Sequence, residues 1–385
     1  MQDYYVDSPQ QLEELCARLH GIKWIALDSE FMREKTYYAQ LCLLQIATDK
    51  IIACIDPLAL ADMTPLLDII YDSSITKVLH SSRQDLEIFY DLRGDLPRPV
   101  FDTQVAAALL GYGDQVGYSA LVNGMLGVQL DKSQTRTDWS TRPLSVEQLQ
   151  YAADDVRYLG KIYSDQYAEL EQRGRLTWLD ADFAELVDVT PYLNAPDEAW
   201  RRVRQANTLK GAQLAVLRAL AAWREQRARA SNRPRKWIIS DDALLELARR
   251  MPGNADALAK IRGLEASTLK HHGVELSGIV QGAKSLAQGE WPLLESPHRL
   301  TSAQEALADA LMATVRLRGA QGAISTASLV TRKELERLVL GERDLPILHG
   351  WRGALVGQDL LALLQGERAL RVQEGSLKIT QESQS

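Results

Sequence analysis

Apolar and polar positions follow two patterns in the first 175 residues: short apolar runs, and apolar residues at helical spacing. The short runs predict strands, and they lie at residues 24–27, 41–47, 50–55, 76–79 and 100–101. The helical patterns follow capping residues or a first-turn proline, and they begin near residues 8, 64, 82, 103 and 145. The last of these carries apolar residues as far as Ile162 and predicts one long helix. This alternation predicts an α/β domain, with a mixed sheet because residues 41–47 and 50–55 are expected to be antiparallel.

After Ala181 the strand pattern disappears and only helices are expected. Two stretches, from Ile261 to Gly282 and from Leu348 to Gly366, share the spacing of their glycines, and they predict two small helical domains about 85 residues apart. The expected divisions are an α/β domain at 1–180, a linker at 181–205, helical domains at 206–290 and 295–370, and a tail at 371–385, which is polar and frayed from Glu382.

Composition narrows the class of protein. With 385 residues, 46% of them hydrophobic and 25% charged, the chain is typical of a soluble globular protein that needs no disulfides. Cys16, Cys42 and Cys54 are odd in number and widely spaced, which argues against a disulfide framework or a thiolate zinc site. No apolar run reaches the ~20 residues of a membrane span, and the N-terminus lacks the pattern of a signal peptide. We therefore expect a cytoplasmic protein without a membrane partner or an obligate protein partner.

The charge is unevenly distributed. A net charge of −7 argues against a nucleic-acid partner, but the segment from Trp200 to Ile238 holds eleven Lys or Arg and a single acid, Glu225. Tryptophans are interleaved with these cations, as in surfaces that bind single-stranded nucleic acid. The alternative is a helical core with a solvated charged face, and it suits the tryptophans better than it suits the charge excess. Candidate contacts to nucleic acid in this segment are Arg227, Arg229 and Arg233.

Two acids follow the first apolar strand one residue apart. Asp28 and Glu30 should emerge on one face at the end of that strand. Acid-x-acid triplets also occur elsewhere in the chain, as in residues 180–182 and 334–336, so this pair alone is weak evidence for a site. A functional site requires further acids that arrive at the same place.

Three more residues could complete such a site. Asp85 lies in the first turn of a helix, where an acid also serves as a cap, and Tyr151 and Asp155 share one face of the long helix, where acids also face solvent. Together, four carboxylates and a tyrosine could hold two divalent cations ~3.5–4 Å apart, the arrangement used for phosphodiester cleavage. His80 is expected to be a core or supporting residue.

In this order and on these elements, Asp28-x-Glu30, Asp85 and Tyr151-x-x-x-Asp155 resemble the tyrosine subclass of the DEDD exonucleases, whose fold is ribonuclease H-like. Within that group the chain is similar to the bacterial ribonuclease D family. The supporting stretches are residues 27–31, 36–41, 131–133 and 138–144. The two helical repeats resemble the HRDC domain shared by RecQ-type helicases and ribonuclease D.

The resemblance implies a role for each site residue. Asp28, Glu30 and Asp155 would hold one Mg²⁺ or Mn²⁺ ion, Asp28 would also touch a second, and Asp85 would support the second through water. Tyr151 would orient the attacking water, because a phenol with a pKa of ~10 is a poor base at neutral pH. Lys132 and Arg142 are candidate contacts to substrate phosphates, or else surface charges.

These observations predict a two-metal 3′→5′ exoribonuclease. It would release nucleoside 5′-monophosphates from structured RNA with a short single-stranded 3′ end, such as a tRNA precursor. A DNA exonuclease with the same catalytic residues is one alternative. A non-catalytic nucleic-acid-binding module is another, and the intact acids and Tyr151 argue against it.

Overall fold

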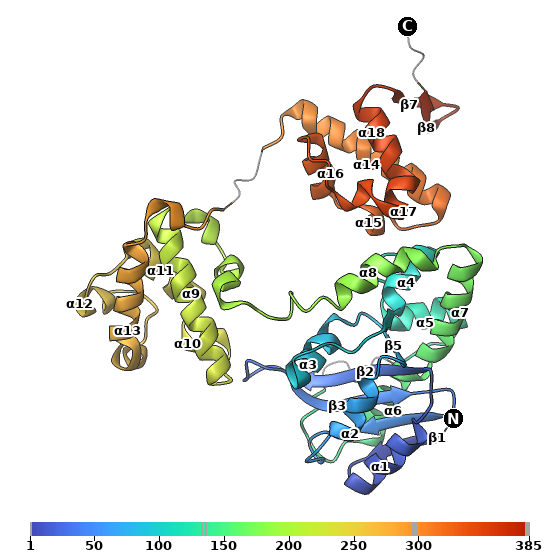
Figure 1. Ribbon diagram of the computed structural model, residues 1–385, viewed down its shortest axis with the longest axis horizontal. Coiled ribbons are helices and arrows are strands. Elements are labelled where there is room, and N and C mark those ends of the chain that lie inside the picture. Colours follow the sequence, from blue (N-terminus) through green and yellow to red (C-terminus); the bar gives the residue numbers. More distant parts are fainter. Residues whose placement is uncertain (1, 132–133, 135–136, 295–298, 382–385) are drawn as a thin grey trace.

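A computed structural model describes residues 2–131, 134, 137–294 and 299–381. The chain forms an α/β domain, a first helical unit (residues 212–284) and a second helical unit (residues 302–364), the last followed by a β-hairpin (Figure 1). Within the described part of the chain, no helix is both long enough and apolar enough to cross a bilayer.

Six strands form one sheet in the α/β domain, in the order β1-β4-β3-β2-β5-β6. The strands are β1 (Gln2–Val6), β2 (Trp24–Met32), β3 (Gln40–Ala47), β4 (Ile51–Ile55), β5 (Thr76–Leu79) and β6 (Val100–Asp102). Antiparallel pairing joins β2 to β3 and β3 to β4, and parallel pairing joins β1 to β4, β2 to β5 and β5 to β6. The expectation of a mixed sheet is confirmed.

Helices cover both faces of this sheet. One face carries α1 (Pro9–Arg18), α2 (Thr64–Ile70) and α3 (Arg83–Arg93), and the other carries α4 (Thr103–Leu110), α6 (Val146–Arg157) and α7 (Leu159–Gln172), with α5 (Tyr118–Leu126) packed on α4 and α7. On β2, Ile25 and Leu27 belong to the first face and Ala26 to the second. Because side chains alternate along a strand, Asp28 and Glu30 follow Ala26 onto the face of α6.

The strand that carries these acids is longer than the sequence indicates. The acids were expected at its end, but β3 pairs with β2 as far as Met32, so Asp28 and Glu30 lie inside a paired strand. The prediction stopped at Leu27 because the apolar run stops there. The edge strand β1 was not expected at all, since its first residues are polar, and it is held by parallel pairing to β4.

The expected long helix is interrupted at Tyr158, between α6 and α7. There the Tyr118 hydroxyl donates to the carbonyl oxygen of Asp154 (3.0 Å) and accepts from the N–H of Tyr158 (3.3 Å). A side chain that enters the backbone ladder in this way bends a helix. The prediction of one unbroken helix was wrong because α5, which carries Tyr118, has too weak an apolar pattern to be anticipated.

The remaining elements are mostly helical. The connection contains η1 (Leu176–Trp178), α8 (Leu179–Leu186), η2 (Pro196–Arg202) and η3 (Ala206–Thr208). The first helical unit comprises α9 (Ala212–Ala230), α10 (Arg235–Ile238), α11 (Asp241–Arg250), α12 (Ala255–Leu258) and α13 (Ala266–Lys284), and η4 (Gln288–Glu290) follows it. The second comprises α14 (Ser302–Gly322), α15 (Thr326–Leu329), α16 (Arg332–Val339), η5 (Pro346–Leu348), α17 (Gly350–Arg352), η6 (Gly353–Gly357) and α18 (Gln358–Leu364).

A hairpin contradicts the expectation of helices only after Ala181. Antiparallel strands β7 (Arg368–Gln373) and β8 (Ser376–Gln381) occupy much of the expected tail. Glu374 and Gly375 both have positive φ in the turn, the backbone that matches a tight hairpin. The signal was missed because the first turn position is Glu rather than Asn or Asp. The polar end from Glu382 lies outside the described residues.

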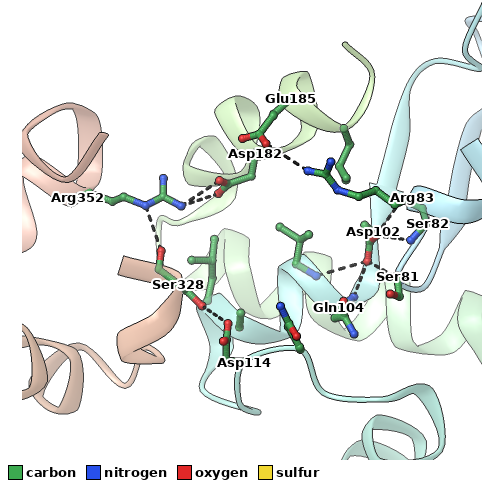
Figure 2. Close-up of a pocket in the computed structure, with 15 residues that line it drawn as sticks. Ser81, Ser82, Arg83, Asp102, Gln104, Asp114, Asp182, Glu185, Ser328 and Arg352 are labelled. Atoms are coloured by element: carbon green, nitrogen blue, oxygen red, sulfur yellow. Dashed lines mark hydrogen bonds and ion pairs between the residues drawn. The ribbon is translucent and has the colours of Figure 1, made fainter. Parts of the chain in front are cut away.

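The second helical unit packs on the α/β domain. The rings of Trp178 and Trp351 are stacked, with centroids 4.6 Å apart and planes 2° from parallel. Arg352 donates to both carboxylate oxygens of Asp182 at 2.9 and 3.1 Å (Figure 2). A cavity of about 270 Å³ lies in this contact. Arg352 and Arg83, which line it, are already paired with acids, so we assign the cavity to the contact between the two parts rather than to catalysis.

Candidate active site

Three carboxylates meet between β2 and α6. Asp28 and Glu30 come from β2 and Asp155 comes from α6, and one carboxylate oxygen from each lies within 4.8 Å of the others. In octahedral Mg²⁺ coordination, with Mg–O bonds of ~2.0–2.1 Å, opposite ligand oxygens stand about 4.2 Å apart. The three side chains therefore have the chemistry and approximately the spacing needed to hold a divalent cation.

Asp85 reaches the same place from the first turn of α3. Its side chain is buried, and the Ser29 hydroxyl donates a hydrogen bond to its Oδ1. The charge of Asp85 contributes to raising the pKa of Asp28, as expected only for neighbouring carboxylates. The structure thus groups three of the predicted acids and places the fourth, Asp85, beside them, where it is linked through Ser29.

Burial raises the pKa of all four acids, and repulsion within the group adds to this effect for Asp28 and Glu30. Burial is the largest cause, and it raises the pKa of Glu30 to about 8, of Asp155 to about 7 and of Asp85 to about 6. Burial and then the charges of Asp85, Asp155 and Glu30 raise the pKa of Asp28 well above its usual range. None of the ion pairs formed among the described residues includes any of the four. Carboxylates that are withdrawn from water without a basic partner fit a bound cation.

Tyr151 stands one helical turn before Asp155 on α6, on the same face. A hydrogen bond from Tyr151 to the Asp155 carboxylate lowers the pKa of Asp155 and so opposes part of the effect of burial. The Tyr151 ring lies 6.2 Å from the ring of Trp139, which is buried. Packing therefore fixes the ring while the hydroxyl faces the acids.

These side chains line a cavity of about 420 Å³. That volume lies within the range of roughly 300–1,000 Å³ typical of small-molecule sites. The lining residues are Asp28, Ser29, Glu30, Phe31, His80, Gln84, Tyr118, Thr137, Trp139, Tyr151, Asp155 and Leu159. Sequence reasoning did not assign Ser29, Gln84, Tyr118 or Thr137 to the site. Only Ser29, between the two paired acids, offered a positional signal.

His80 lines the cavity but does not join the acid cluster. Its Nδ1 lies 2.9 Å from the Thr103 hydroxyl oxygen and its Nε2 lies 2.9 Å from the carbonyl oxygen of Val116. Both ring nitrogens thus have partners other than a cation. The pKa of His80 is lowered, chiefly by burial. These contacts agree with a supporting role.

Lys132 and Arg142 were predicted to contact substrate phosphates near the site. Lys132 lies outside the described residues. Arg142 donates to both carboxylate oxygens of Asp56, at 2.6 and 2.8 Å, and to the carbonyl oxygens of Cys42 and Trp139, each at 2.7 Å. The guanidinium of Arg142 is therefore occupied in tying the segment before α6 to β3 and β4.

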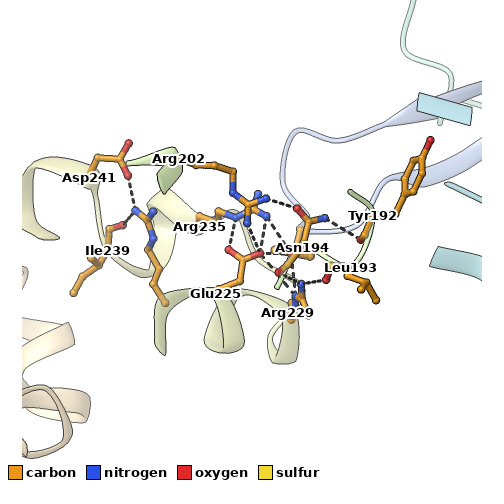
Figure 3. Close-up of polar contacts among 11 residues, drawn as sticks. Tyr192, Leu193, Asn194, Arg202, Glu225, Arg229, Arg235, Ile239 and Asp241 are labelled. Carbon is orange, nitrogen blue, oxygen red and sulfur yellow. Dashed lines mark hydrogen bonds and ion pairs between the residues drawn. The ribbon is translucent and has the colours of Figure 1, made fainter. Parts of the chain in front are cut away.

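The three candidate arginines of the first helical unit also differ. Arg227 donates to both carboxylate oxygens of Glu275. Arg229 donates to the carbonyl oxygens of Leu193 and Asn194 (Figure 3). Arg233 is exposed and lies over the ring of Trp237, 5.7 Å from its centroid. Of the three, Arg233 keeps the guanidinium most available to a ligand.

Arg229 belongs to a contact between the first helical unit and the hairpin that joins β2 to β3. We call it the Tyr37 junction, and it comprises Tyr37, Glu225, Arg229, Asn232 and Arg235. The Tyr37 hydroxyl donates to the buried Glu225 carboxylate and accepts from Arg229 (3.0 Å) and Arg235 (3.1 Å). The Asn232 side chain accepts from the N–H of Tyr37 at 3.1 Å. Glu225, the single acid of the basic segment, is thus the centre of an interdomain contact.

Four basic side chains of this segment form no hydrogen bond or ion pair within the described ranges, and all four are exposed: Arg204, Lys210, Arg233 and Lys236. The side chain of Trp237, next to Lys236, is 53% exposed. These residues, rather than Arg227 and Arg229, are the ones free to meet a polyanion.

Comparison with known proteins agrees with this geometry. Residues 4–171 match the 3′-5′ exonuclease family, and residues 213–280 match the HRDC domain. Ribonuclease D of Sphingobium indicum is 40% identical over 380 residues, which cover 97% of this chain and 98% of that protein. Ribonuclease D of Zymomonas mobilis is 40% identical over 375 residues, 96% of each chain. The crystal structure of Escherichia coli RNase D, an exoribonuclease involved in structured RNA processing, has a TM-score of 0.81 and 34% identity, covering 95% of this chain and 99% of that one.

An α/β domain of this topology, with carboxylates gathered at one cavity and an HRDC domain behind it, defines a 3′-5′ exonuclease. Sequence identity with the two ribonuclease D relatives, over nearly the whole length of each protein, identifies the family within this class. The chain belongs to the ribonuclease D family and is a 3′-5′ exoribonuclease, a hydrolase that acts on RNA. The resemblance drawn from the sequence is confirmed.

Proposed function

We propose that this exoribonuclease releases nucleoside 5′-monophosphates from RNA 3′ ends with the help of two divalent cations. The observation that carries the proposal is a group of four carboxylates, the half-buried Asp28, Glu30 and Asp155 and the buried Asp85, which have no basic partner among the described residues. Such a group is costly to keep ionised unless cations neutralise it.

The position of each acid decides which of the two cations it would hold. Asp28, Glu30 and Asp155 would hold one cation, and Asp28 together with Asp85 would hold the other. When bound, Mg²⁺ or Mn²⁺ ions would acidify the attacking water and neutralise the leaving oxygen. Carboxylate oxygens suit both metals.

Tyr151 is assigned to the attacking water. A phenol ordinarily has a pKa of ~10, so at neutral pH this side chain orients the water by hydrogen bonding rather than by taking its proton. The water oxygen forms a bond to the terminal phosphorus, and the bond from that phosphorus to the O3′ of the preceding nucleotide breaks. The O3′ takes up a proton, and the terminal nucleotide leaves as its 5′-monophosphate.

We infer that the substrate is a structured RNA with a short single-stranded 3′ end, such as a tRNA precursor. The E. coli relative is described as acting in structured RNA processing. Exposed Arg204, Lys210, Arg233 and Lys236 and the aromatic face of Trp237 offer phosphate contacts and base stacking on the first helical unit. Three free cysteines favour the reducing cytoplasm as the compartment.

We also propose that the second helical unit is a diverged HRDC domain. Each unit begins with a long helix, of 19 residues in α9 and 21 in α14. A four-residue helix follows in each, α10 and α15, and then a helix whose N-cap side chain, Ser240 or Thr331, accepts a backbone hydrogen bond. The shared order of elements supports a common fold, although only residues 213–280 match the family itself.

The test is a digestion of a tRNA precursor with a 3′ extension, with matched RNA and DNA oligomers alongside. We expect 5′-monophosphates from RNA with Mg²⁺ or Mn²⁺, no product with EDTA, and slower cleavage of DNA. Full activity in EDTA would contradict the metal assignment. Faster cleavage of DNA would contradict the preference for RNA.

A further inference from the structure

Ser29 lies between the paired acids but its side chain belongs to the other face of the sheet. Along β2 it follows Ile25 and Leu27, which face α3, whereas Asp28 and Glu30 follow Ala26 toward α6. Ser29 is 8% exposed and Asp85, on α3, is 7% exposed. Ser29 is therefore the residue of the acid-x-acid triplet that can reach α3.

The contacts of Ser29 join strand β2 to helix α3. Its hydroxyl donates to Oδ1 of Asp85. Its backbone N–H also lowers the pKa of Asp85 and of Asp28, a small effect beside that of burial. β5 pairs with β2 only from Trp24 to Ala26, so beyond Ala26 this edge of β2 is open to side chains from both faces. At that edge the Ser29 side chain contacts the acid of α3 from a position between the two acids of β2.

We propose that Ser29 is a positioning residue that fixes the orientation of the Asp85 carboxylate at the metal site through its hydroxyl. The inference rests on the proposed function, which assigns Asp85 to the second cation. A carboxylate can accept about four hydrogen bonds, so the one from the Ser29 hydroxyl orients Asp85 and still leaves capacity toward a cation. No cation from the described part of the chain holds Asp85, so Ser29 is its main side-chain constraint.

The direct test compares Ser29→Val with Ser29→Thr, which have nearly the same shape but differ in the hydroxyl. Mg²⁺ and Mn²⁺ binding is measured by calorimetry without RNA, and kcat and KM are measured on a 3′-tailed RNA oligomer. We expect Ser29→Val to weaken Mg²⁺ binding and lower kcat by about 10- to 100-fold, the usual effect of removing a partner that orients a ligand, with KM unchanged. Ser29→Thr should keep values near those of the wild type.

Equal behaviour of the Val and Thr variants, whether both normal or both impaired, would overturn the inference, because the hydroxyl would then make no difference. Ser29→Ala repeats the comparison if the larger side chains disturb folding, and normal Mg²⁺ binding by Ser29→Ala would also overturn it. Thr314→Val is the matched control, because it removes a buried hydroxyl of the second helical unit that donates to the Ala310 carbonyl. Its Mg²⁺ binding should be unchanged.

Asp85→Asn distinguishes a failure of the role proposed for Ser29 from a failure of the role proposed for Asp85. Loss of Mg²⁺ binding in Asp85→Asn with normal binding in Ser29→Val would remove only the role of Ser29. Normal Mg²⁺ binding and activity in Asp85→Asn would instead remove the assignment of Asp85, and with it that part of the proposed function.

Discussion

At the scale of single residues, the four acids make the metal-free protein sensitive to pH. Folded pKa values of about 8 for Glu30, 7 for Asp155 and 6 for Asp85 lie above the ~4 of an unfolded chain. From pH ~4 to ~8 the folded state therefore holds protons that the unfolded state has lost. The stability that these three acids contribute is therefore lost as the pH rises through this window.

We expect the melting temperature of the EDTA-treated protein to drop, on the order of 5 °C, between pH 5 and pH 8.5. Added Mg²⁺ should restore it at the higher pH. Asp28→Asn should show a smaller drop because one repelling charge is removed, and it should lose hydrolysis. Differential scanning calorimetry and a digestion assay measure both. A melting temperature independent of pH, or an active Asp28→Asn, would contradict the assignment of these acids.

Tyr151→Phe isolates the hydroxyl that faces the acids. We expect kcat to fall by about 100-fold, because the attacking water loses its orienting partner, while KM for RNA and the affinity for Mg²⁺ change little. Single-turnover kinetics and calorimetry give these quantities. Tyr112→Phe, on an exposed tyrosine outside the cavity, is the control. A Tyr151→Phe enzyme that cuts at the normal rate would reduce Tyr151 to a packing residue.

At the scale of elements, the β2–β3 hairpin connects the acids to the first helical unit. β2 carries Asp28 and Glu30, and the loop beyond it carries Tyr37, whose hydroxyl meets Glu225 and two arginines. A hydrogen bond to a buried charge contributes ~1.5–3 kcal/mol. The contact is therefore strong enough to hold the unit against the hairpin.

Tyr37→Phe should weaken that contact. We expect faster proteolytic cleavage of the connection at residues 187–195 and a decrease of ~1–3 kcal/mol in the free energy of unfolding by denaturant. Tyr38→Phe is the matched control, since Tyr38 is the adjacent tyrosine and is 38% exposed. The same proteolysis rate in both variants would mean that the Tyr37 hydroxyl does not hold the unit in place.

The helices and strands also show how much of the structure could be predicted from the sequence. Strands with apolar runs and helices with caps were predicted near their observed positions. Of the predicted site residues, Asp28, Glu30, Tyr151 and Asp155 line one cavity and Asp85 lies beside it. β1 and the β7–β8 hairpin were missed because their stability comes from partners distant in sequence or from a turn without Asn. The break at Tyr158 depends on a hydroxyl from α5, and no local pattern records such a contact. The partners of Arg142 and Arg229 could not be predicted either, because they are distant in the sequence.

At the scale of the whole molecule, affinity for RNA should come from the basic side chains that form no hydrogen bond or ion pair with other described residues. We expect charge reversal of Arg204, Lys210, Arg233 and Lys236 in the full-length protein to weaken binding of a tRNA precursor. Every phosphate that is no longer bound should flatten the slope of log affinity against log salt by about 0.7 for single strands. Fluorescence anisotropy at several salt concentrations measures this slope.

Lys50→Glu is the control for this series, because Lys50 is exposed in the turn between β3 and β4 of the α/β domain. Reversal of Arg229 is a poor substitute, since it would also break the Tyr37 junction. Salt slopes that match the wild type would show that these four cations face solvent only, and the RNA-binding surface would have to lie elsewhere.

The stacked pair Trp178 and Trp351 and the Tyr37 junction fix both helical units to the α/β domain before any RNA arrives. A preassembled surface saves the cost of ordering on binding. It also fixes a distance. If the folded body of an RNA rests on a rigid unit, its 3′ strand must span a constant distance to reach the acids. Each nucleotide removed shortens that strand, and trimming stops when the strand can no longer reach. The length of tail left on a mature RNA would then be a property of this docking geometry rather than of any base the enzyme reads.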